Sequence, residues 1–391
     1  MKSNQENRRR ILKTGVALLA SGTPAAVQSG RRGADSLQRK ADMLLQKAVE
    51  ARDIPGVVAM ATDRDRPIYQ GAFGQRVLGQ NTAMTTDTVV WIASMTKVLV
   101  STAAMQLVEQ GKLDLDGSAT RWVPELSKIQ VLRGWDGNGQ PRTRAPQRPI
   151  TLRHLLTHTS GFSYDLWNAD IGRYQEVTKL PGIGSGQNAA LFAPLVADPG
   201  ERWEYGIGID WVGKIIEAVS GKTLGAYLQA HLFAPLEMTS TAFKLTPHLR
   251  KRLAQVHQRG DNGKWTLSDF GLPEAPEFQS GGGGLYSTAG DYLRFIRMIL
   301  NRGSLSGNQV LKPETVDLML KNHLKDIGKV YGLGGMVNGK GRYEWGGAAG
   351  TRFWVDCREG HYVVFMIQNW GRKPGTWDVF KKHAQTALVG E

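Results

Sequence analysis

The chain has 391 residues, of which 41% are hydrophobic and 21% are charged, and 49 lysines and arginines against 35 acidic residues give a formal net charge of +14. This is the composition of an ordinary globular protein, large enough for one two-lobed domain or for two domains. The positive charge can attract anionic surfaces, but no nucleic-acid motif accompanies it, so we predict a solvated basic surface and no nucleic-acid binding.

The first 29 residues resemble a twin-arginine export signal. The run Asn7-Arg8-Arg9-Arg10-Ile11-Leu12-Lys13 places arginines before an apolar residue, a leucine and a lysine, and a mildly apolar stretch follows from Thr14 to Ala26. This stretch is too short and too weakly apolar to span a membrane, so no stable membrane insertion is expected. We expect cleavage between Ala25 and Gly30 and a periplasmic or secreted protein; the alternative is a disordered basic tail on a cytoplasmic protein.

Strand patterns cluster at both ends of the chain. Helical periodicity from Asp35 to Arg52 precedes two predicted strands, Val57 to Thr62 and Ile68 to Gly74. The C-terminal end mirrors this pattern, with strands predicted at 351–356 and 362–368 and a closing helix at 376–388. Helices and loops dominate the region between. The sequence therefore predicts a mixed α/β (α+β) fold, in which an antiparallel sheet built from both chain ends is flanked by helices and carries a mostly helical inserted lobe.

Changes of pattern along the chain set the predicted lobe boundaries. These are residues 30–112 and 280–391 for the α/β lobe and 113–279 for the helical lobe, with the active site between the lobes. Within the middle region, the polar segment from Arg133 to Pro149 is predicted to be a loop. Further on, Ser287 or Thr288 is the predicted cap of a helix from Asp291 to Leu300, because both side chains can accept a hydrogen bond from a backbone N–H at a helix start.

Ser94 and Lys97 stand three residues apart before a stretch, Val98 to Val108, that is apolar nearly all the way round. Such a stretch predicts a helix buried on every side, with both residues on one face of its first turn. The helix start offers backbone N–H groups to an oxyanion, and apolar surroundings are expected to lower the pKa of Lys97, so that its neutral amine can act as a base. Taken alone the spacing is weak evidence, because a serine cap beside a solvated lysine is commoner.

Two further segments supply candidate catalytic groups. Tyr205 lies in a glycine-flanked loop before an amphipathic helix from Ile209 to Val219, and a tyrosine beside a buried cation can relay a proton. The consecutive glycines Gly346 and Gly347 let the backbone come close to a ligand. In isolation the first segment also fits a packed tyrosine, and the second a flexible hairpin.

Four segments, in this order, resemble the serine β-lactamase and penicillin-binding-protein superfamily, and most closely its class C-like branch, the family VIII carboxylesterases. They are Ser94-Met95-Thr96-Lys97, Leu155-Leu156-Thr157-His158-Thr159-Ser160-Gly161, Pro199-Gly200 through Tyr205, and Trp345-Gly346-Gly347. The resemblance extends over residues 35–388. It implies a β-lactamase/transpeptidase-like fold and a serine hydrolase that works through an acyl-enzyme.

The resemblance also implies a role for individual residues. Ser94 is the expected nucleophile, Lys97 and Tyr205 are its proton-transfer groups, and either of the two can be the base in acylation. The backbone N–H groups of Ser94 and Ala348 would form the oxyanion hole. His158 belongs to a structural segment; it stands four residues after His154, but no carboxylate or cysteine partner is near in sequence, so neither a metal nor another cofactor is expected.

Departures from the superfamily pattern narrow the expected substrate. Trp345 stands where β-lactamases and peptidases carry a cation that binds a substrate carboxylate, which predicts a preference for uncharged esters. Ile207 stands where lactamases commonly have an asparagine, and this also favours esters over β-lactams. Arg352 can restore some positive charge, so weak β-lactam activity is left open. The aromatic residues near the motifs are candidates for the substrate pocket; they are Phe162, Tyr164, Trp167 and Tyr286.

The sequence thus predicts a serine ester hydrolase that cleaves small acyl esters, with a small-molecule ester as its partner. Its oligomeric state is left open. The alternatives are a β-lactamase, a D-amino-acid amidase or peptidase, and a penicillin-binding protein that is acylated without turnover. No Gly-x-Ser-x-Gly segment is present, which argues against an α/β-hydrolase. Cys357 is the single cysteine, so it cannot form an intramolecular disulfide and is expected to be structural or incidental.

Overall fold

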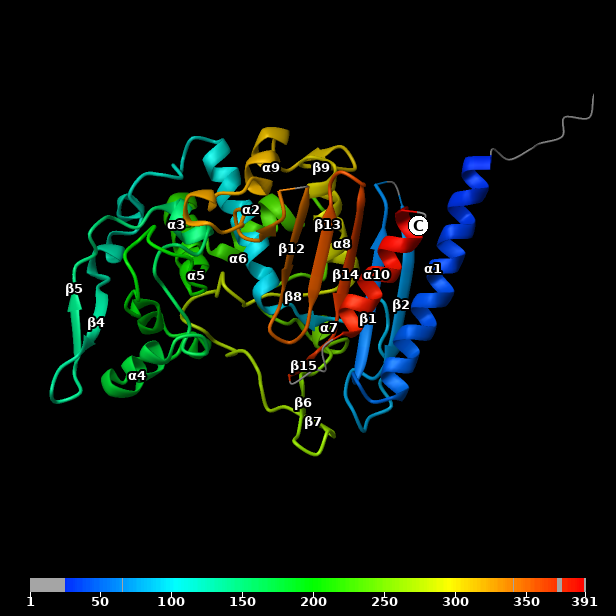
Figure 1. Ribbon diagram of the computed structural model, residues 1–391, viewed down its shortest axis with the longest axis horizontal. Helices are drawn as coiled ribbons and strands as arrows, with labels where there is room; N and C mark the ends of the chain where they lie inside the picture. Colours follow the sequence, from blue (N-terminus) through cyan, green and yellow to red (C-terminus); the bar gives the residue numbers. More distant parts are fainter. Residues whose placement is uncertain (1–24, 65, 340, 371–374, 390–391) are drawn as a thin grey trace, which may run out of the picture.

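The computed structural model describes residues 25–389 apart from 65, 340 and 371–374. Its centre is a six-stranded sheet in the order β11-β12-β13-β14-β1-β2, in which every neighbouring pair is antiparallel. The strands are β1 (Gly56–Thr62), β2 (Pro67–Gly74), β11 (Met336–Val337), β12 (Arg342–Gly346), β13 (Arg352–Asp356) and β14 (His361–Met366). Strand β1 pairs with β14, so the two chain ends share one sheet, as the sequence predicts (Figure 1).

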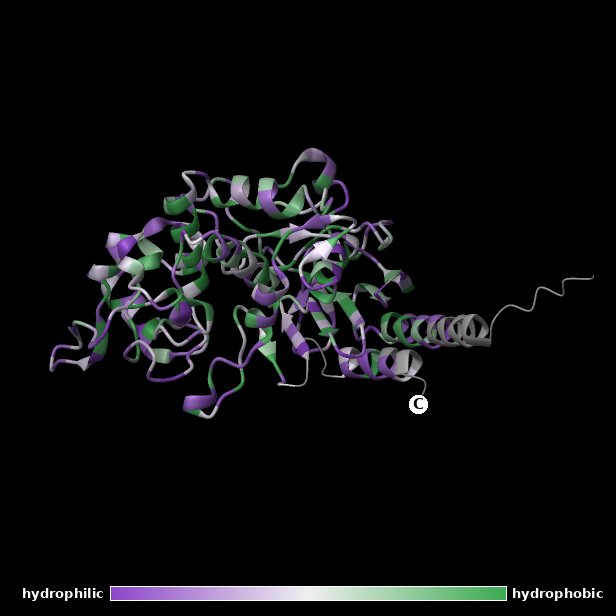
Figure 2. Cartoon of the chain, turned by 90° about the horizontal axis from the view of Figure 1, so that it is seen from above, coloured by the Kyte–Doolittle hydropathy of each residue, from purple (hydrophilic) through white to green (hydrophobic). Residues whose placement is uncertain are grey.

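Both faces of this sheet are covered by helices. Strand β1 directs Val57, Ala59 and Ala61 to one face, where α1 (Ala25–Glu50) and α10 (Thr376–Val389) pack, and directs Val58 and Met60 to the other face and the main core. This alternation follows from the two-residue period of a strand. The main core includes α8 (Ala289–Leu300). Figure 2 shows α1 and α10 side by side, with apolar and polar residues alternating along them.

The middle of the chain contributes most of the remaining helices. They are α2 (Thr96–Glu109), α3 (Leu152–Leu156), α4 (Ala169–Thr178), α5 (Gly208–Ser220), α6 (Leu224–Leu228), α7 (Pro247–Arg250) and α9 (Pro313–Leu320). The short helical turns are η1 (Ala93–Met95), η2 (Ala119–Arg121), η3 (Pro124–Lys128), η4 (Ile183–Ser185), η5 (Asn188–Phe192), η6 (Gln229–Phe233) and η7 (Lys325–Ile327). Helix α2 is buried from Thr96 to Leu107, which confirms the helix predicted from its apolar sequence.

Four smaller sheets lie outside the central sheet in the described part of the chain. Three are strand pairs: β3 (Val90–Trp91) with β8 (Tyr286–Ser287), β4 (Val131–Trp135) with β5 (Pro141–Arg144), and β9 (Ser304–Leu305) with β10 (Asn308–Gln309). The fourth has three strands, in the order β15 (Asn369–Trp370), β6 (His257–Arg259) and β7 (Trp265–Leu267). The hairpin of β4 and β5 corrects the predicted loop at 133–149. Asp136 closes its turn by accepting hydrogen bonds from the backbone N–H groups of Asn138 and Gln140, and β5, which consists of proline, arginine and threonine, had no apolar pattern to reveal the hairpin.

Two helix boundaries bear directly on the predictions. Thr288 caps α8, because its hydroxyl oxygen accepts a hydrogen bond from the N–H of Asp291 at 3.2 Å; this confirms the predicted cap and helix. Helix α1 begins at Ala25, ten residues before the predicted start, since no proline interrupts the sequence between Pro24 and Pro55. Residues 1–24, which hold most of the predicted export signal, lie outside the described residues, so export remains a prediction. No helix in the described part of the chain combines the length and apolar character needed to cross a membrane.

Candidate active site

Ser94 lies on the 3-10 turn η1, which leads directly into α2. The turn begins at Ala93 with a φ of +46°, a conformation that costs free energy for a residue with a Cβ and persists only where neighbours enforce it. Neighbouring segments hold both sides of the turn: the N–H of Ile92 donates to the carbonyl oxygen of Leu285 at 3.0 Å, and the hydroxyl of Tyr292 donates to the carbonyl oxygen of Met95 at 3.0 Å. The serine is thus presented on a fixed backbone, half-buried beside a cavity.

The structure brings Ser94, Lys97 and Tyr205 together. The hydroxyl of Tyr205 donates a hydrogen bond of 2.7 Å to Ser94 Oγ, and Lys97 Nζ donates to the same oxygen at 3.2 Å. Lys97 also donates to the Tyr164 hydroxyl at 3.0 Å and to the carbonyl oxygen of Gly282 at 2.6 Å. Tyr164, which the sequence placed in the pocket lining, is therefore a direct partner of Lys97.

The electrostatic setting of Lys97 differs from the prediction. Its side chain is fully buried, and burial alone lowers the pKa of an amine. Tyr164, Tyr205 and the carboxylate of Asp210 outweigh burial, however, and the pKa of Lys97 lies above its ordinary value. The prediction of a lowered pKa is therefore wrong, because a sequence pattern of apolar residues does not reveal which charged group packs against the amine. These contacts favour the protonated, ammonium form of Lys97.

Asp210 is the charged residue of this site that sequence reasoning missed. It lies in the first turn of α5 and is 1% exposed, and burial raises its pKa. Its Oδ1 atom accepts hydrogen bonds from Ser280 Oγ at 2.7 Å and from the Gly282 N–H at 2.9 Å. An aspartate five residues after Tyr205, on the otherwise apolar face of an amphipathic helix, was the signal available in the sequence.

Aromatic rings surround Tyr205. The ring centroid of His158 lies 4.7 Å away, that of Trp345 lies 5.5 Å away and that of Trp203 lies 6.1 Å away. His158 has a φ of +56°, and burial together with the positive charge of Lys97 lowers its pKa well below the ordinary value, so it is neutral. These rings restrict the orientation of the Tyr205 phenol, because they occupy the space on the sides away from the cavity.

The predicted histidine pair is not arranged as a metal site. His154 Nδ1 accepts a hydrogen bond from the N–H of Thr151 within a helix cap, whereas His158 packs among the rings around Tyr205. Within the described ranges, no cluster of three or more histidine, cysteine, aspartate or glutamate side chains is placed to hold a metal ion.

The turn after β12 lies beside Ser94. A Cβ at Gly347 would collide with Thr351 Oγ1 and with the carbonyl oxygen of Ile92, two residues before Ser94, so only glycine allows this approach. The N–H of Gly347 donates to the carbonyl oxygen of Thr351 at 2.7 Å, whereas the N–H of Ala348 has no acceptor among the described residues. A free backbone donor thus remains on this turn, as an oxyanion hole requires.

A cavity of about 1200 Å³ opens over Ser94. Of the predicted site residues, those that line it are Ser94, Tyr164, Trp167, Tyr205, Trp345, Gly346, Gly347 and Ala348. Phe162 lies instead in the core, 1% exposed and packed on Trp211, and Tyr286 pairs with Trp91 in a strand ladder outside the lining. Most of the wall is apolar or aromatic, and Leu166 and Trp167 project at its rim with 85% and 69% of their surfaces exposed.

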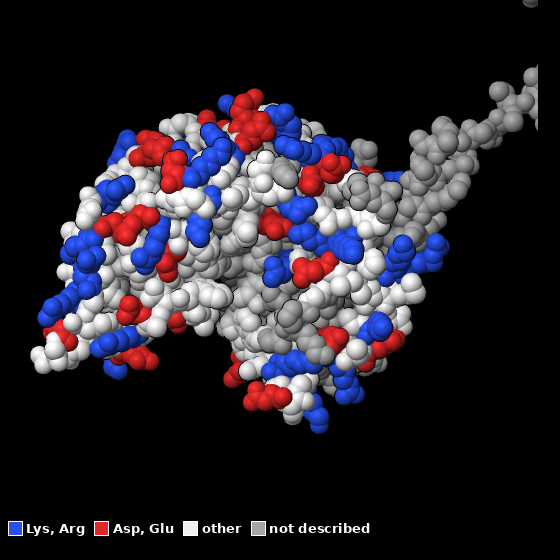
Figure 3. Space-filling view, in the orientation of Figure 1, with Lys and Arg blue, Asp and Glu red and all other residues white. Residues whose placement is uncertain are grey.

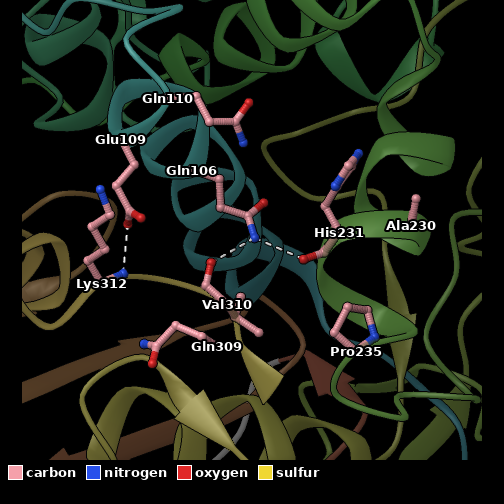
Figure 4. Close-up of a pocket in the computed structure, with 9 residues that line it drawn as sticks. All are labelled: Gln106, Glu109, Gln110, Ala230, His231, Pro235, Gln309, Val310 and Lys312. Carbon is pink, nitrogen blue, oxygen red and sulfur yellow. Dashed lines mark hydrogen bonds between the residues drawn. The ribbon is translucent and has the colours of Figure 1, made fainter. Parts of the chain in front are cut away.

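A second, smaller cavity of about 340 Å³ lies at the opposite end of α2 and shares no lining residue with the first. Figure 4 shows it bounded by Gln106, whose side-chain amide donates to the carbonyl oxygens of His231 and Val310, and by Glu109, which accepts from the backbone N–H of Lys312. These hydrogen bonds join elements of the core, and the lining contains neither serine nor cysteine. On the face drawn in Figure 3, basic and acidic residues are interspersed rather than gathered by sign.

We compared the sequence and the structure with those of known proteins. A sequence profile of the β-lactamase family matches residues 41–384. Monacolin J acid methylbutanoyltransferase of Aspergillus terreus is 38% identical over 291 residues, which span 72% of this chain and 70% of that protein. Lovastatin esterase of Penicillium rubens is 32% identical over 378 residues, which span 84% and 92%. The structure of a mutant of simvastatin synthase from Aspergillus terreus superimposes with a TM-score of 0.81 at 31% identity, covering 90% of this chain and 96% of the other. These matches confirm the predicted superfamily and its fold.

Proposed function

The chain belongs to the β-lactamase family, and we propose that within this family it is a serine ester hydrolase that forms an acyl-enzyme on Ser94. The observation that carries the proposal is the pair of hydrogen bonds that Ser94 Oγ receives, from Tyr205 at 2.7 Å and from Lys97 at 3.2 Å, at the floor of a largely apolar cavity. A hydroxyl held between two proton-transfer groups is the arrangement that nucleophilic catalysis requires. An esterase and an acyltransferase among the relatives support the same chemistry.

In the proposed acylation step, Tyr205 accepts the serine proton. The Lys97 ammonium lies 5.0 Å from the centre of the Tyr205 ring and favours negative charge on the phenol oxygen. As Ser94 Oγ bonds to the ester carbonyl carbon, its proton passes to the Tyr205 oxygen while the phenol's own proton moves to the alcohol oxygen of the ester, and the N–H groups of Ser94 and Ala348 hold the developing oxyanion. The carbon–oxygen bond to the alcohol then breaks, and the alcohol leaves with the proton from Tyr205. Water then attacks the acyl carbon and passes a proton to Tyr205, while the phenol's own proton returns to Ser94 Oγ. The bond between Ser94 Oγ and the acyl carbon breaks, and the acid is released.

The choice of esters over β-lactams rests on Trp345. The side chain at this position packs among Tyr205, His158 and Tyr331; it carries no positive charge, and its single N–H donor is buried. A β-lactam carboxylate therefore loses a charge-assisted hydrogen bond at this point. We propose small acyl esters as substrates, with β-lactams turned over slowly.

The first test compares 4-nitrophenyl acetate and butyrate with a chromogenic cephalosporin, using the wild type and Ser94→Ala. We expect ester turnover that the variant loses, with little cephalosporin hydrolysis. Rapid cephalosporin hydrolysis would instead identify a β-lactamase. A stable adduct of one acyl group per chain, without turnover, would identify a penicillin-binding protein. Faster release from an amide than from the matched ester would identify an amidase or peptidase.

Acyl transfer to an alcohol is a second candidate function. The cavity of about 1200 Å³ exceeds what a butyryl group fills, and one relative is named a methylbutanoyltransferase. A bulky alcohol that enters the cavity can replace water as the acceptor of the acyl group. The test adds a ring-bearing secondary alcohol to the butyrate assay and measures the new ester by mass spectrometry. Formation of butyric acid alone, at every alcohol concentration, would limit the function to hydrolysis.

A further inference from the structure

Asp210 approaches Lys97 through one residue of the neighbouring loop. Asp210 Oδ1 accepts the N–H of Gly282 at 2.9 Å, and the carbonyl oxygen of the same glycine accepts Lys97 Nζ at 2.6 Å. A Cβ at Gly282 would lie against the Asp210 carboxylate, so the glycine allows the two segments to come this close. The carboxylate and the ammonium are thus held on either side of a single residue.

Both charges are taken out of water. Asp210 is 1% exposed and Lys97 is fully buried, and a buried charge is tolerated where an opposite charge or hydrogen bonds compensate it. The other titratable groups that face Lys97 are Tyr164 and Tyr205, each of which carries a hydroxyl, and His158, which is neutral. Asp210 is therefore the carboxylate that faces this ammonium among the described residues.

The hydrogen bonds of Asp210 do not by themselves require a charge. Its Oδ1 atom accepts from both Ser280 Oγ and the Gly282 N–H, and an asparagine oxygen in the same place would accept both. Its Oδ2 atom is buried without a hydrogen-bond partner, which is costly for a group that serves only to tie a loop to a helix. An electrostatic role explains why a carboxylate occupies this position.

We propose that Asp210 is a positioning residue that acts through its charge: it holds Lys97 as an ammonium, and this ammonium in turn favours negative charge on the Tyr205 oxygen that accepts the Ser94 proton. The inference rests on the proposed function and deepens it. It assigns the base role to Tyr205, and it assigns to Lys97 the role of a fixed cation rather than that of a neutral base.

The pH dependence of activity tests the sign of this effect. A negative charge near an amine favours its protonated form, so removing the charge lowers the pKa of Lys97, and burial then lowers it further. The wild type is expected to keep kcat/KM level from pH 8 to pH 10. In Asp210→Asn the ammonium is lost as the pH rises, so kcat/KM for 4-nitrophenyl butyrate should gain a descending limb in this range and fall by about tenfold or more at its upper end.

Two control variants separate the effect of the Asp210 charge from the effect of its hydrogen bonds. Ser280→Ala removes one hydrogen bond to Asp210 and leaves the charge, whereas Asp291→Asn removes a buried carboxylate that accepts from Ser240 and Thr241 away from the cavity. Both should retain the wild-type shape of the pH profile, whatever their absolute rates. A descending limb confined to Asp210→Asn supports the proposal. Equal losses in Asp210→Asn and Ser280→Ala with unmoved profiles would overturn it, as would higher activity of Asp210→Asn near neutral pH, which identifies Lys97 as a neutral base.

A stability measurement keeps the inference testable if the wild type hydrolyses no ester. Thermal unfolding of the wild type, Lys97→Met, Asp210→Asn and the double variant forms a cycle that needs no substrate. If the two charges compensate each other, Lys97→Met should lower Tm by less in the Asp210→Asn background than in the wild type, because the isolated carboxylate is no longer present. Equal shifts in both backgrounds would overturn the coupling, independently of the proposed function.

Discussion

Tyr205, Lys97 and Tyr164 form the hydrogen bonds around the Ser94 hydroxyl and the Lys97 amine. Tyr205→Phe removes the 2.7 Å hydrogen bond to Ser94 Oγ, and Lys97→Met removes the ammonium. Each is expected to lower kcat/KM for 4-nitrophenyl butyrate by about 10² to 10⁴, the usual loss when acid–base assistance is removed. Tyr164→Phe, which removes only the 3.0 Å hydrogen bond to Lys97, should cause a smaller loss. Near wild-type turnover in either of the first two variants would disprove the proton-transfer assignment.

The residue at position 345 is expected to set the ratio of ester to lactam hydrolysis. Trp345 lines the cavity beside Gly346 and has no hydrogen-bond partner for its buried ring N–H. Trp345→Lys introduces a cation that can bind a β-lactam carboxylate. Steady-state rates for the butyrate ester and for a cephalosporin, measured on the same preparations, should show the ratio move towards the cephalosporin. Trp345→Leu controls for the loss of the ring, and the same ratio in both variants would contradict the role of charge.

Local motifs were sufficient to select three side chains that meet at the candidate site, but not to predict their surroundings. Ser94, Lys97 and Tyr205 stand in short segments whose spacing is distinctive, and the structure brings all three together. Asp210 could not be assigned because its partner, Gly282, is distant in sequence, and contact between them depends on how α5 meets the glycine-rich loop. The pKa of Lys97 was mispredicted for the same reason, since the compensating charge comes from another element.

At the scale of elements, the turn after β12 demands glycine at position 347. A methyl group there would collide with Thr351 Oγ1 and with the carbonyl oxygen of Ile92. Gly347→Ala should therefore cost about 1 to 3 kcal/mol in the free energy of unfolding and displace the free N–H of Ala348. Gly137→Ala is the matched control, because nothing lies within 4 Å of a Cβ at that position. Denaturant unfolding and ester turnover measure the two effects, and equal stability of both variants would contradict the close approach.

The elements that were predicted well are those with an apolar pattern. Strand β1 is buried along its whole length and α2 is buried on all sides, so each reads as an uninterrupted apolar segment. Strand β12 alternates charged and aromatic residues, as a half-buried strand does, but it was missed because this pattern extends over only four residues before Gly346. Both charged side chains are held in place by tertiary contacts: Glu344 accepts from Lys381 at 2.9 Å, and Arg342 lies over the Trp354 ring. No short-range pattern encodes such contacts.

At the scale of the whole molecule, the active site depends on contacts between distant segments. Val58 pairs with Met366 in the central sheet, and Ser94 accepts a hydrogen bond from Tyr205, which is 111 residues away in sequence. The sequence predicted the sheet because strands appeared at both ends, whereas the positions at which the lobes divide remain a prediction. Each part of the site comes from a different stretch of chain, and the turn after β12 joins the sheet to the site. We therefore expect substitutions that disturb the sheet to lower catalytic activity as well as stability.

Fully and partly buried histidines make the stability of the whole molecule depend on pH. Burial lowers the pKa of His154 to about 4, and it also lowers the pKa of His158, His257, His323 and His361. These side chains stay neutral in the folded protein at pH values where they take up protons in the unfolded chain, whose histidine pKa is about 6.5. The unfolded state then binds more protons, so the free energy of unfolding should be at its full value above about pH 6.5 and should fall as the pH drops from there towards 4.

Urea unfolding at pH 5, 6, 7 and 8 measures how the free energy of unfolding changes with pH. His154→Asn should reduce this change, whereas His248→Asn, at an exposed position, should not; a stability that stays constant from pH 8 to pH 5 would contradict the argument.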